Sequence, residues 1–412
     1  MKHCDQHRSH SGSLTQCAVM AVALAFLFLP GVSAIQAQTY TVLHNFDGGD
    51  DGGEPASGVT FDQQGRIYGT ASLGGSHGYG LVYRIVHQGE GAVLSPIYNF
   101  HGGDGDTPYA RVLFGPDGLL YGTTAFGGAG SDGTVFSLQP PATACETVLC
   151  PWVETVLHGF TGGADGGYPE FGDLSFDQAG NIYGTTESGG SSGDGVVFKL
   201  SRSGGGWTES VLWNFTGHGD GGGPYAGVIF DNAGNLYGTA TFGGASNLGT
   251  VYELSPTQSG WTETTLYSFT NNDRGNPFGG LAMDANGDLF GLTGGGYGPG
   301  AAYELTLLNG SWSFTLLQSF TEEEGPLAAP TLDAQGNLYG PLPFGGEDGE
   351  GEIFKLTPSG NQWIYSAFYQ FGSGSGGVEP DGAVTFDASG NMYGTTLVYG
   401  SGGLGTVWEI TP

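Results

Sequence analysis

One short phrase recurs seven times along this chain, and it constrains the fold more than any other feature. The phrase reads GNLYGT with small changes, and its aromatic residues are Tyr68, Tyr121, Tyr183, Tyr237, Phe290, Tyr339 and Tyr393. Successive copies are 53, 62, 54, 53, 49 and 54 residues apart. Repeats of this length are typical of arrays in which each copy is one supersecondary unit. We therefore expect residues 35–412 to form a single domain of seven repeats.

The fourth copy shows what one unit contains. Its strand-like segments are Gly227–Asp231, Asn235–Thr241, Gly249–Leu254 and Trp261–Phe269. Each is rich in β-branched or aromatic residues and is bounded by Gly, Pro, Asn or Asp, which indicates a β-strand. We expect a turn over Ser255–Gly260, which contains Pro256. Four antiparallel strands per repeat, seven times over, predict an all-β, seven-bladed β-propeller.

The order of the strands predicts how the ring closes. The first segment of each copy is short and flanked by glycine, which suits the crowded centre, and the long last segment suits the rim. Residues 40–46 form an unpaired strand of the last type, and the chain ends at Gly405–Pro412 on a strand of the third type. We predict that residues 40–46 complete the seventh blade. The alternative places the long segment innermost and pairs residues 40–46 with the first repeat.

The first 34 residues have the pattern of a secretory signal peptide. Lys2 and Arg8 lie in a polar leader, residues 17–29 form an uncharged apolar run, and small residues follow at 32–34. This run is shorter than the ~20 residues of a membrane span. We expect a secreted or periplasmic protein without a membrane span after cleavage; an uncleaved N-terminal anchor is the alternative.

Two cysteines, Cys145 and Cys150, lie beyond this leader. Disulfides form and persist in the oxidising compartments that exported proteins reach. We therefore expect Cys145 and Cys150 to form a disulfide that closes a very short loop. Two free thiols are the alternative.

The charge balance excludes several classes of partner. The chain has 40 acidic and 9 basic residues and a net charge of −31. Nucleic acids and anionic membrane surfaces need clustered Lys and Arg, so neither is an expected partner. Aromatic residues make up 13% of the chain, which supplies a core and excludes a disordered chain. We expect a monomer.

The repeated residues resemble the GloVer (Gloeo/Verruco) tandem-repeat family of exported bacterial proteins, whose members carry a choice of C-terminal anchors. The resemblance covers residues 39–412. It rests on the LYGTT phrase at Leu120–Thr124, on Gly127 and Gly128 after it, and on GTVF at Gly133–Phe136. It implies an exported repeat protein and no particular activity. This chain ends on its last repeat, so we expect release rather than surface attachment.

Most of the repeated motif has an expected structural role. Six copies have an aspartate three residues before the turn glycine, at Asp62, Asp177, Asp231, Asp284, Asp333 and Asp387, and the second copy has Gly115 there. An aspartate at such a turn can accept backbone N–H bonds. We expect the tyrosine of the phrase to pack between blades and the glycine after it to admit a neighbour.

The loops that lead into each repeat are rich in glycine and carboxylates. In a propeller, the loops that lead into each repeat are expected on the same face as the loops that follow the GNLYGT phrase. Calcium prefers six to eight oxygen ligands, and candidate ligands are Asp47, Asp50, Asp51, Glu54, Asp104 and Asp106. No copy has EF-hand spacing, so the alternative is that these are solvated turn residues. No other cofactor is indicated.

One position before the first strand of each copy is expected to surround the mouth of the central channel. Its residues are Gly58, Arg111, Asp173, Gly227, Gly280, Ala329 and Ala383. Arg111 and Asp173 depart from the small residues of the other copies. They either pair across adjacent blades or form part of a substrate site. Two residues earlier stand the aromatic residues Tyr109, Phe171, Tyr225 and Phe278, which could stack on sugars or fill gaps between blades.

These features favour the binding of an extracellular ligand or cell-envelope component, with a glycan as the best candidate. The rival is a carbohydrate-active enzyme. Hydrolysis needs two carboxylates roughly 5–10 Å apart, with Asp173, Glu170 and Asp381 as candidates. A lyase needs a base such as His101 or Tyr109, with Arg111 neutralising a uronate. A third hypothesis is a structural or adhesive envelope protein.

Three histidines are expected near the loop face, at His77, His101 and His218. No two of them have the spacing of a metal-ligand pair, so the sequence does not indicate zinc.

Overall fold

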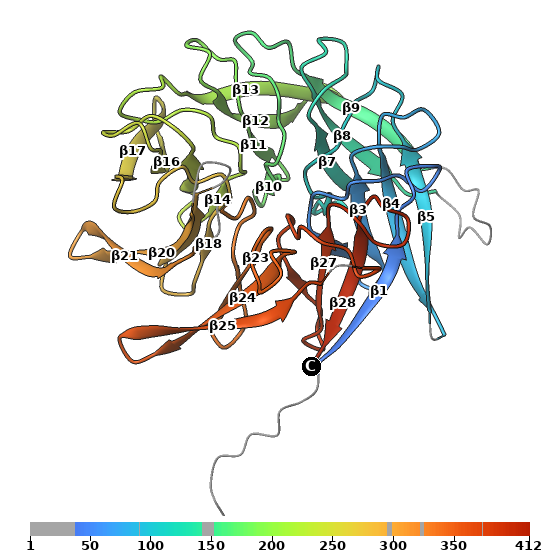
Figure 1. Cartoon of the computed structure of the whole chain (residues 1–412). Coiled ribbons are helices and arrows are strands. Elements are labelled where there is room, and N and C mark those ends of the chain that lie inside the picture. Colours follow the sequence, from blue (N-terminus) through green and yellow to red (C-terminus); the bar gives the residue numbers. More distant parts are fainter. Residues whose placement is uncertain (1–37, 90, 142–151, 295–298, 322–324, 373) are drawn as a thin grey trace, which may run out of the picture. The chain divides into compact units, whose positions relative to one another are not determined.

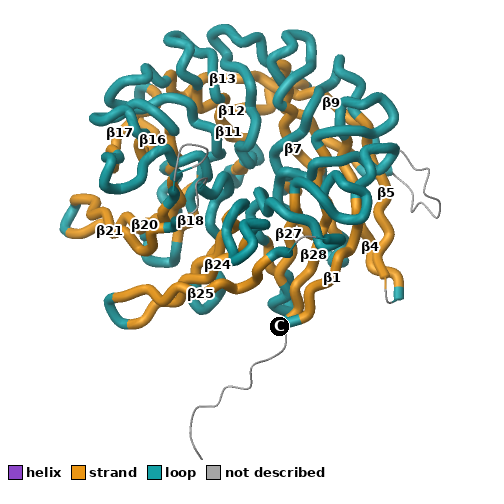
Figure 2. Tube along the Cα trace, viewed as in Figure 1, coloured by secondary structure: helices purple, strands orange, loops and turns teal. Residues whose placement is uncertain are grey.

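Twenty-eight strands make up the described part of the chain, and they fall into seven four-stranded antiparallel sheets. The computed structural model describes residues 38–412 apart from 90, 142–151, 295–298, 322–324 and 373. The sheets are arranged around a centre as the blades of a propeller (Figures 1 and 2). Across the described ranges no helix has the length and apolar character needed to cross a membrane. The expected signal peptide and the pair Cys145 and Cys150 lie outside the described residues.

The strands occupy four positions in each blade. The inner strands are β2 (Thr60–Phe61), β6 (Leu113–Phe114), β10 (Ser175–Phe176), β14 (Ile229–Phe230), β18 (Ala282–Met283), β22 (Thr331–Leu332) and β26 (Thr385–Phe386). The second strands are β3 (Ile67–Ala71), β7 (Leu120–Thr124), β11 (Ile182–Thr186), β15 (Leu236–Ala240), β19 (Leu289–Thr293), β23 (Leu338–Leu342) and β27 (Met392–Thr396). The third strands are β4 (Leu81–Gln88), β8 (Thr134–Gln139), β12 (Val196–Ser203), β16 (Thr250–Thr257), β20 (Ala301–Leu308), β24 (Glu352–Ser359) and β28 (Thr406–Thr411). The outer strands are β5 (Gly91–Asn99), β9 (Val153–Gly159), β13 (Gly206–Asn214), β17 (Gly260–Ser268), β21 (Ser311–Ser319), β25 (Gln362–Gln370) and β1 (Thr39–Asn45).

The short first strand of each repeat is innermost, as its length and flanking glycines predict. Neighbouring inner segments bond to one another around the centre. Thr331 of blade 6 donates to the carbonyl oxygen of Val384 over 2.8 Å, and Thr385 of blade 7 donates to that of Val59 over 2.9 Å. The bond from Thr385 joins the seventh blade to the first and therefore links the two ends of the repeat array.

The ring closes through the N-terminal strand, and this prediction is confirmed. Strand β1 pairs antiparallel with β28 from Thr39↔Thr411 to Asn45↔Thr406. Tyr40 stacks on Tyr369 of blade 6 with ring centroids 4.6 Å apart. The last blade is therefore built from both ends of the domain, and β1 covers the edge of β28 that would otherwise be unpaired.

The expected turn over Ser255–Gly260 is wrong in its extent. Strand β16 continues to Thr257, and β17 already begins at Gly260. Pro256 therefore lies within a strand, opposite Trp261. The proline is tolerated because β15 pairs with β16 only as far as Leu254, so beyond that point one edge of β16 has no ladder to interrupt.

The core lies between blades rather than in one central layer. Tyr183 and Val197 of blade 3, for example, pack with Val228, Leu236 and Tyr252 of blade 4. The tyrosine of the repeated phrase therefore does pack between blades.

The glycine that follows this tyrosine admits a ring from the third strand of its own blade. A Cβ on Gly69 would lie 2.3 Å from the hydroxyl oxygen of Tyr83. A Cβ on Gly394 would lie 2.4 Å from the indole of Trp408. Any side chain at these positions would displace a fully buried aromatic ring, which explains the glycine in the phrase.

The aspartates before the turns close those turns, as expected. The carboxylate of Asp177 accepts the backbone N–H groups of Ala179 and Asn181 over 3.0 and 2.9 Å. Asp231 and Asp387 repeat this arrangement in their blades. The bond that the tyrosine hydroxyl adds, such as Tyr183 to Asp177 over 3.0 Å, was not predicted.

Candidate ligand-binding site

A cavity of about 300 Å³ lies at the centre of the ring, where the chain enters the inner strands. All seven residues of the position before the first strand line it, as the repeat alignment predicts: Gly58, Arg111, Asp173, Gly227, Gly280, Ala329 and Ala383. We call this cavity the channel-mouth pocket. Its volume is at the small end of the range for ligand sites, roughly 300–1,000 Å³.

Small residues at this position follow from the close approach of neighbouring blades. A Cβ on Gly58 would lie 2.3 Å from the carbonyl oxygen of Ala383, and one on Gly227 would lie 2.0 Å from that of Asp173. At these two glycines the pocket wall is therefore backbone. A charged side chain here is the exception, and it has room only to extend into the pocket.

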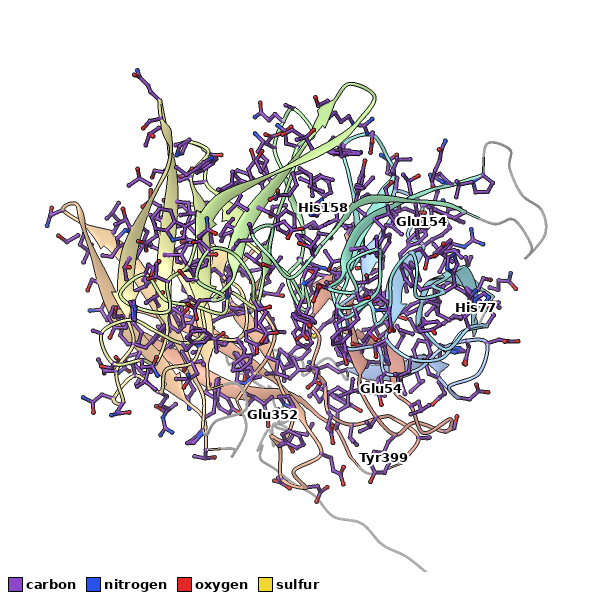
Figure 3. All side chains as sticks on the ribbon, turned by 90° about the horizontal axis from the view of Figure 1, so that it is seen from above. Glu54, His77, Glu154, His158, Glu352 and Tyr399 are labelled. Atoms are coloured by element: carbon purple, nitrogen blue, oxygen red, sulfur yellow. The ribbon has the colours of Figure 1, made fainter. Side chains whose placement is uncertain are left out.

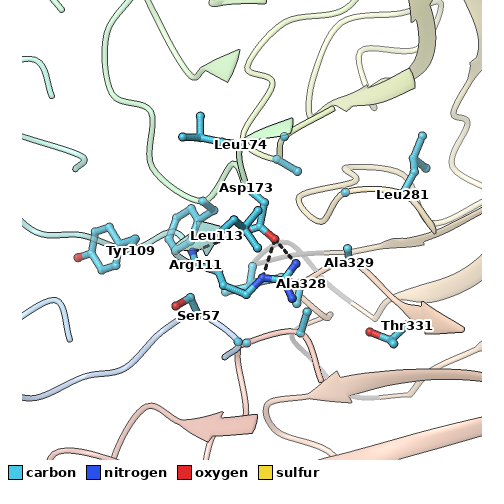
Figure 4. A pocket seen from close by; sticks show the side chains of 18 of the residues that line it. Ser57, Tyr109, Arg111, Leu113, Asp173, Leu174, Leu281, Ala328, Ala329 and Thr331 are labelled. Carbon is cyan, nitrogen blue, oxygen red and sulfur yellow. Dashed lines mark hydrogen bonds and ion pairs between the residues drawn. The ribbon is translucent and has the colours of Figure 1, made fainter. Parts of the chain in front are cut away.

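Arg111 and Asp173 are that exception, and they pair across blades 2 and 3. Nη2 and Nε of Arg111 donate to Oδ2 of Asp173 over 2.6 and 3.0 Å, and the backbone N–H of Arg111 donates to Oδ1 over 3.3 Å. Nη1 donates to the Thr385 hydroxyl on blade 7 over 3.4 Å. Figure 4 shows both side chains pointing into the pocket. The Arg111 side chain is 24% exposed and that of Asp173 is 36% exposed, so the pair can meet a ligand.

The four predicted aromatic residues form two ring pairs between blades, one stacked and one tilted. Tyr109 and Phe171 have ring centroids 5.1 Å apart with planes inclined by 25°, and both line the pocket. Tyr225 and Phe278 have centroids 4.7 Å apart. Neither is among the described residues that line the pocket. The hydroxyl of Tyr225 instead donates to Glu187 over 2.6 Å.

The candidate carboxylates, like the aromatic residues, only partly line the pocket. Asp173 and Asp381 line the pocket, whereas Glu170 is not among its described lining residues. Burial raises the pKa of Glu170 to about 7, with a further contribution from the charge of Glu187. The structure therefore brings two of the three candidate carboxylates to one cavity.

The predicted histidines lie outside the pocket lining described here. Nε2 of His101 is 3.0 Å from Oδ2 of the buried Asp104, and its ring centroid is 6.1 Å from that of His77. His218 lies in a loop and bridges to Gly221. Of the two bases considered for a lyase, only Tyr109 lines the pocket.

The loop carboxylates mainly close their own loops. Asp47 accepts the backbone N–H of Gly49 over 2.9 Å, and Oδ2 of Asp51 is 2.8 Å from Nε2 of His44. Asp104 accepts the backbone N–H of His101 over 2.9 Å.

Some of the loops that lead into a blade also receive a ring donor from the outer strand before them, and sequence reasoning missed this. Trp213 donates to Asp220 over 3.3 Å and Tyr267 to Asp273 over 2.7 Å. A donor ring six or seven residues before the aspartate was the available signal.

The two sets of loops share one face, as predicted. Bridges such as Gly53↔Leu73 and Asp106↔Phe126 join the loop before a blade to the loop after its second strand. Within the described ranges, no three His, Cys, Asp or Glu residues gather as they would around a metal ion. Calcium at Asp47, Asp50, Asp51, Glu54, Asp104 and Asp106 stays a prediction.

Comparison with known proteins identifies the repeat and the fold. A family model described as the Gloeobacter/Verrucomicrobia repeat matches residues 32–153 and 152–325. No curated protein sequence matches the chain.

Among solved structures, a candidate 6-phosphogluconolactonase from Bacteroides uniformis is similar at 15% identity and a TM-score of 0.51, covering 77% of this chain and 84% of that one. The extracellular domain of a candidate one-component system from B. thetaiotaomicron is similar at 10% identity and a TM-score of 0.54, covering 90% of this chain and 40% of that one. At these identities the likeness shows the fold alone.

Proposed function

This chain belongs to the family that carries the Gloeobacter/Verrucomicrobia repeat, and we propose that it is an exported propeller that binds an extracellular glycan at the channel-mouth pocket. One observation carries the proposal. The Arg111–Asp173 pair extends into a cavity whose five other equivalent positions are glycine or alanine. The pair therefore departs from the repeat at the one place where all seven blades meet.

The pair and its surroundings suit a sugar. A guanidinium and a carboxylate side by side offer donors and acceptors close together, which matches neighbouring hydroxyl groups. The stacked rings of Tyr109 and Phe171 add aromatic surface to the same wall. Export is supported by the signal-peptide pattern of residues 1–34.

A carbohydrate-active enzyme is the second candidate, because Asp173 and Asp381 both line the pocket. Asp173 is held by three hydrogen bonds from Arg111, which favours a binding role over that of a free base. Release of new chain ends from a bound polysaccharide would show an enzyme. Absence of any soluble glycan ligand would favour a structural or adhesive envelope protein.

The test is binding of the purified protein to an array of oligosaccharides, with Arg111→Ala as the probe variant. Arg202→Ala is the matched control, since Arg202 makes an ion pair of the same 2.6 Å length with Asp117, outside the pocket lining. We expect wild type and Arg202→Ala to bind the same glycans and Arg111→Ala to bind at least about tenfold more weakly. Unchanged binding by Arg111→Ala would place the glycan elsewhere.

A further inference from the structure

The charges that line the channel-mouth pocket are unbalanced. Arg111 is the one basic residue among the described lining residues, and Asp173 and Asp381 are both acidic. One cation therefore lines the small cavity together with two carboxylates. An added negative charge in such a place is repelled more strongly than it would be in water.

The guanidinium of Arg111 is already engaged. Nε and Nη2 bond to Asp173, and Nη1 bonds to Thr385. A ligand carboxylate would have to share the guanidinium with Asp173, whose charge already offsets that of Arg111, and would meet the negative charge of Asp173 beside it. A hydroxyl group can use the remaining N–H groups and the outer lone pairs of Asp173 without separating the pair.

Three carboxylates act on one residue of the pocket wall, although none of them is among the described lining residues. Burial raises the pKa of Tyr109, and the negative charges of Glu170, Glu54 and Asp106 raise it further. These three carboxylates therefore lie close enough to act on a residue of the pocket wall. The whole chain has a net charge of −31, so an anionic ligand is repelled on approach as well as inside the pocket.

The wall contributed by blades 5 and 6 is apolar. It includes Leu281, Leu327, Ala328 and Pro330. Figure 4 shows Leu281 apart from the Arg111–Asp173 pair. A pyranose ring has a polar edge of hydroxyl groups and apolar C–H faces, so it matches a pocket with one ionic and one apolar side.

We propose that the channel-mouth pocket selects uncharged sugars and rejects uronic acids. This inference rests on the glycan-binding function proposed above, and it narrows the ligand class. It also argues against a lyase, because such an enzyme would need Arg111 to neutralise a uronate that the pocket repels.

The experiment compares matched oligosaccharides that differ only at C6, where a hydroxymethyl group replaces a carboxylate. The pairs are galactose and galacturonate, glucose and glucuronate, and mannose and mannuronate oligomers of equal length, measured by calorimetry at low salt. We expect the neutral member of at least one pair to bind, and to bind at least about tenfold tighter than its acidic partner. An acidic member that binds as tightly as its neutral partner overturns the inference while leaving glycan binding intact. If no member of any pair binds, or if binding survives Arg111→Ala, the proposed function fails together with the inference.

Asp381→Asn tests the electrostatic origin of the discrimination. Removing one of the two lining carboxylates is expected to reduce the ratio of neutral to acidic affinity several-fold, and high salt is expected to reduce it in wild type. Asp117→Asn, which removes a carboxylate outside the pocket lining, is expected to leave the ratio unchanged. An unchanged ratio in Asp381→Asn together with no salt dependence would show that shape rather than charge excludes the acid, and would overturn the argument.

Discussion

The hydroxyl of Tyr121 donates a 2.7 Å hydrogen bond to Asp117, four residues earlier. In blade 3, Tyr183 donates instead to Asp177, six residues earlier. The second blade has Gly115 at that earlier place, and Asp117 replaces the missing carboxylate. Asp117 also accepts the backbone N–H of Leu119 over 3.2 Å. The link between turn and second strand is thus kept although the residue that provides it has moved.

This link predicts that turn aspartates stabilise the propeller measurably. In blade 4, Asp231 accepts bonds from the backbone of Ala233 and Asn235, from the Asn235 amide and from the Tyr237 hydroxyl. Asp231→Ala leaves these donors without their acceptor and is expected to lower the free energy of unfolding by ~1–3 kcal/mol. Thermal and urea unfolding measure the change. The control Asp50→Ala removes an exposed loop carboxylate, and an equal loss there would refute the specific role of the turn.

The repeat let the sequence predict this part of the fold in some detail. Seven copies of one pattern identified the aspartate before the turn and its backbone bonds. The replacement by Asp117 was missed because the copies were compared position by position, whereas a hydrogen bond requires only that the carboxylate reach the tyrosine. The spacing of four residues between Asp117 and Tyr121 was visible in the sequence.

For the candidate site, the sequence predicted which positions surround the channel but not which side chains face the pocket. Alignment of the copies placed Arg111 and Asp173 on one ring around the channel, and the structure confirms that placement. The alignment could not predict which aromatic rings face the pocket, because the orientation of each ring depends on its partners in other loops. The hydroxyl of Tyr225 bonds to Glu187, 38 residues away, and Tyr225 is not among the lining residues.

Half-buried carboxylates on the outer strands predict a contribution to stability that is lost as pH rises toward neutrality. Burial raises the pKa of Glu154 and of Glu209 to about 7, with further contributions from Asp104 and Asp165, respectively. Figure 3 labels Glu154 on β9. Because these folded pKa values exceed the unfolded value of 4.5, the folded state binds more protons between pH 4.5 and 7. These two groups should therefore lower the melting temperature as pH rises across that interval, and His158, whose pKa burial lowers, acts in the opposite direction.

The double variant Glu154→Gln, Glu209→Gln tests this origin. It removes both titrations while keeping the side-chain shape, so its melting temperature should depend less on pH between 4.5 and 7 than that of wild type. Some dependence of the melting temperature on pH should remain in the double variant, since burial also raises the pKa of Glu170 to about 7. A slope equal to that of wild type would show that other groups set the pH dependence.

Three of the turn aspartates, Asp62, Asp177 and Asp333, predict the opposite trend at lower pH. Burial alone would raise the pKa of Asp177, but bonds from Asn181, Tyr183 and Ala179 outweigh it and hold the pKa below the ordinary 3.8. A depressed folded pKa contributes stability that is lost as pH falls through it. The melting temperature should therefore also decrease as the pH falls below 3.8. Asp177→Asn should weaken this acid limb, and an unchanged acid limb would contradict the assignment.

The expected disulfide has a direct chemical test, because Cys145 and Cys150 are the two cysteines beyond the leader. In protein exported to an oxidising compartment, iodoacetamide should add to neither residue under denaturing conditions unless a reductant is present. Mass spectrometry of the peptide that contains both residues measures this. Since the loop is very short, reduction should lower stability by less than the usual ~2–4 kcal/mol. Alkylation without reductant would show free thiols.

The last prediction concerns a backbone feature that recurs before the loop prolines. The residue preceding the proline has a left-handed φ in several blades, with Thr107 at 56° and Tyr168 at 59°, and the fourth blade uses Gly223 at 61°. A left-handed conformation costs a residue other than glycine roughly 1–2 kcal/mol, and threonine is among the least suited because it is β-branched. Glycine costs roughly 0.5–1 kcal/mol in lost unfolded-state entropy.

Thr107→Gly should therefore raise the free energy of unfolding by up to ~1 kcal/mol, even though it removes a hydrogen bond from Thr107 to Asp106. The reciprocal change Gly223→Thr should lower it, since a Cβ there would also lie 2.6 Å from the ring of Phe242. Chemical unfolding of both variants gives the comparison. Were Thr107→Gly to destabilise the protein, the threonine would be accommodated in this loop without strain, and its hydrogen bond to Asp106 would outweigh the backbone cost.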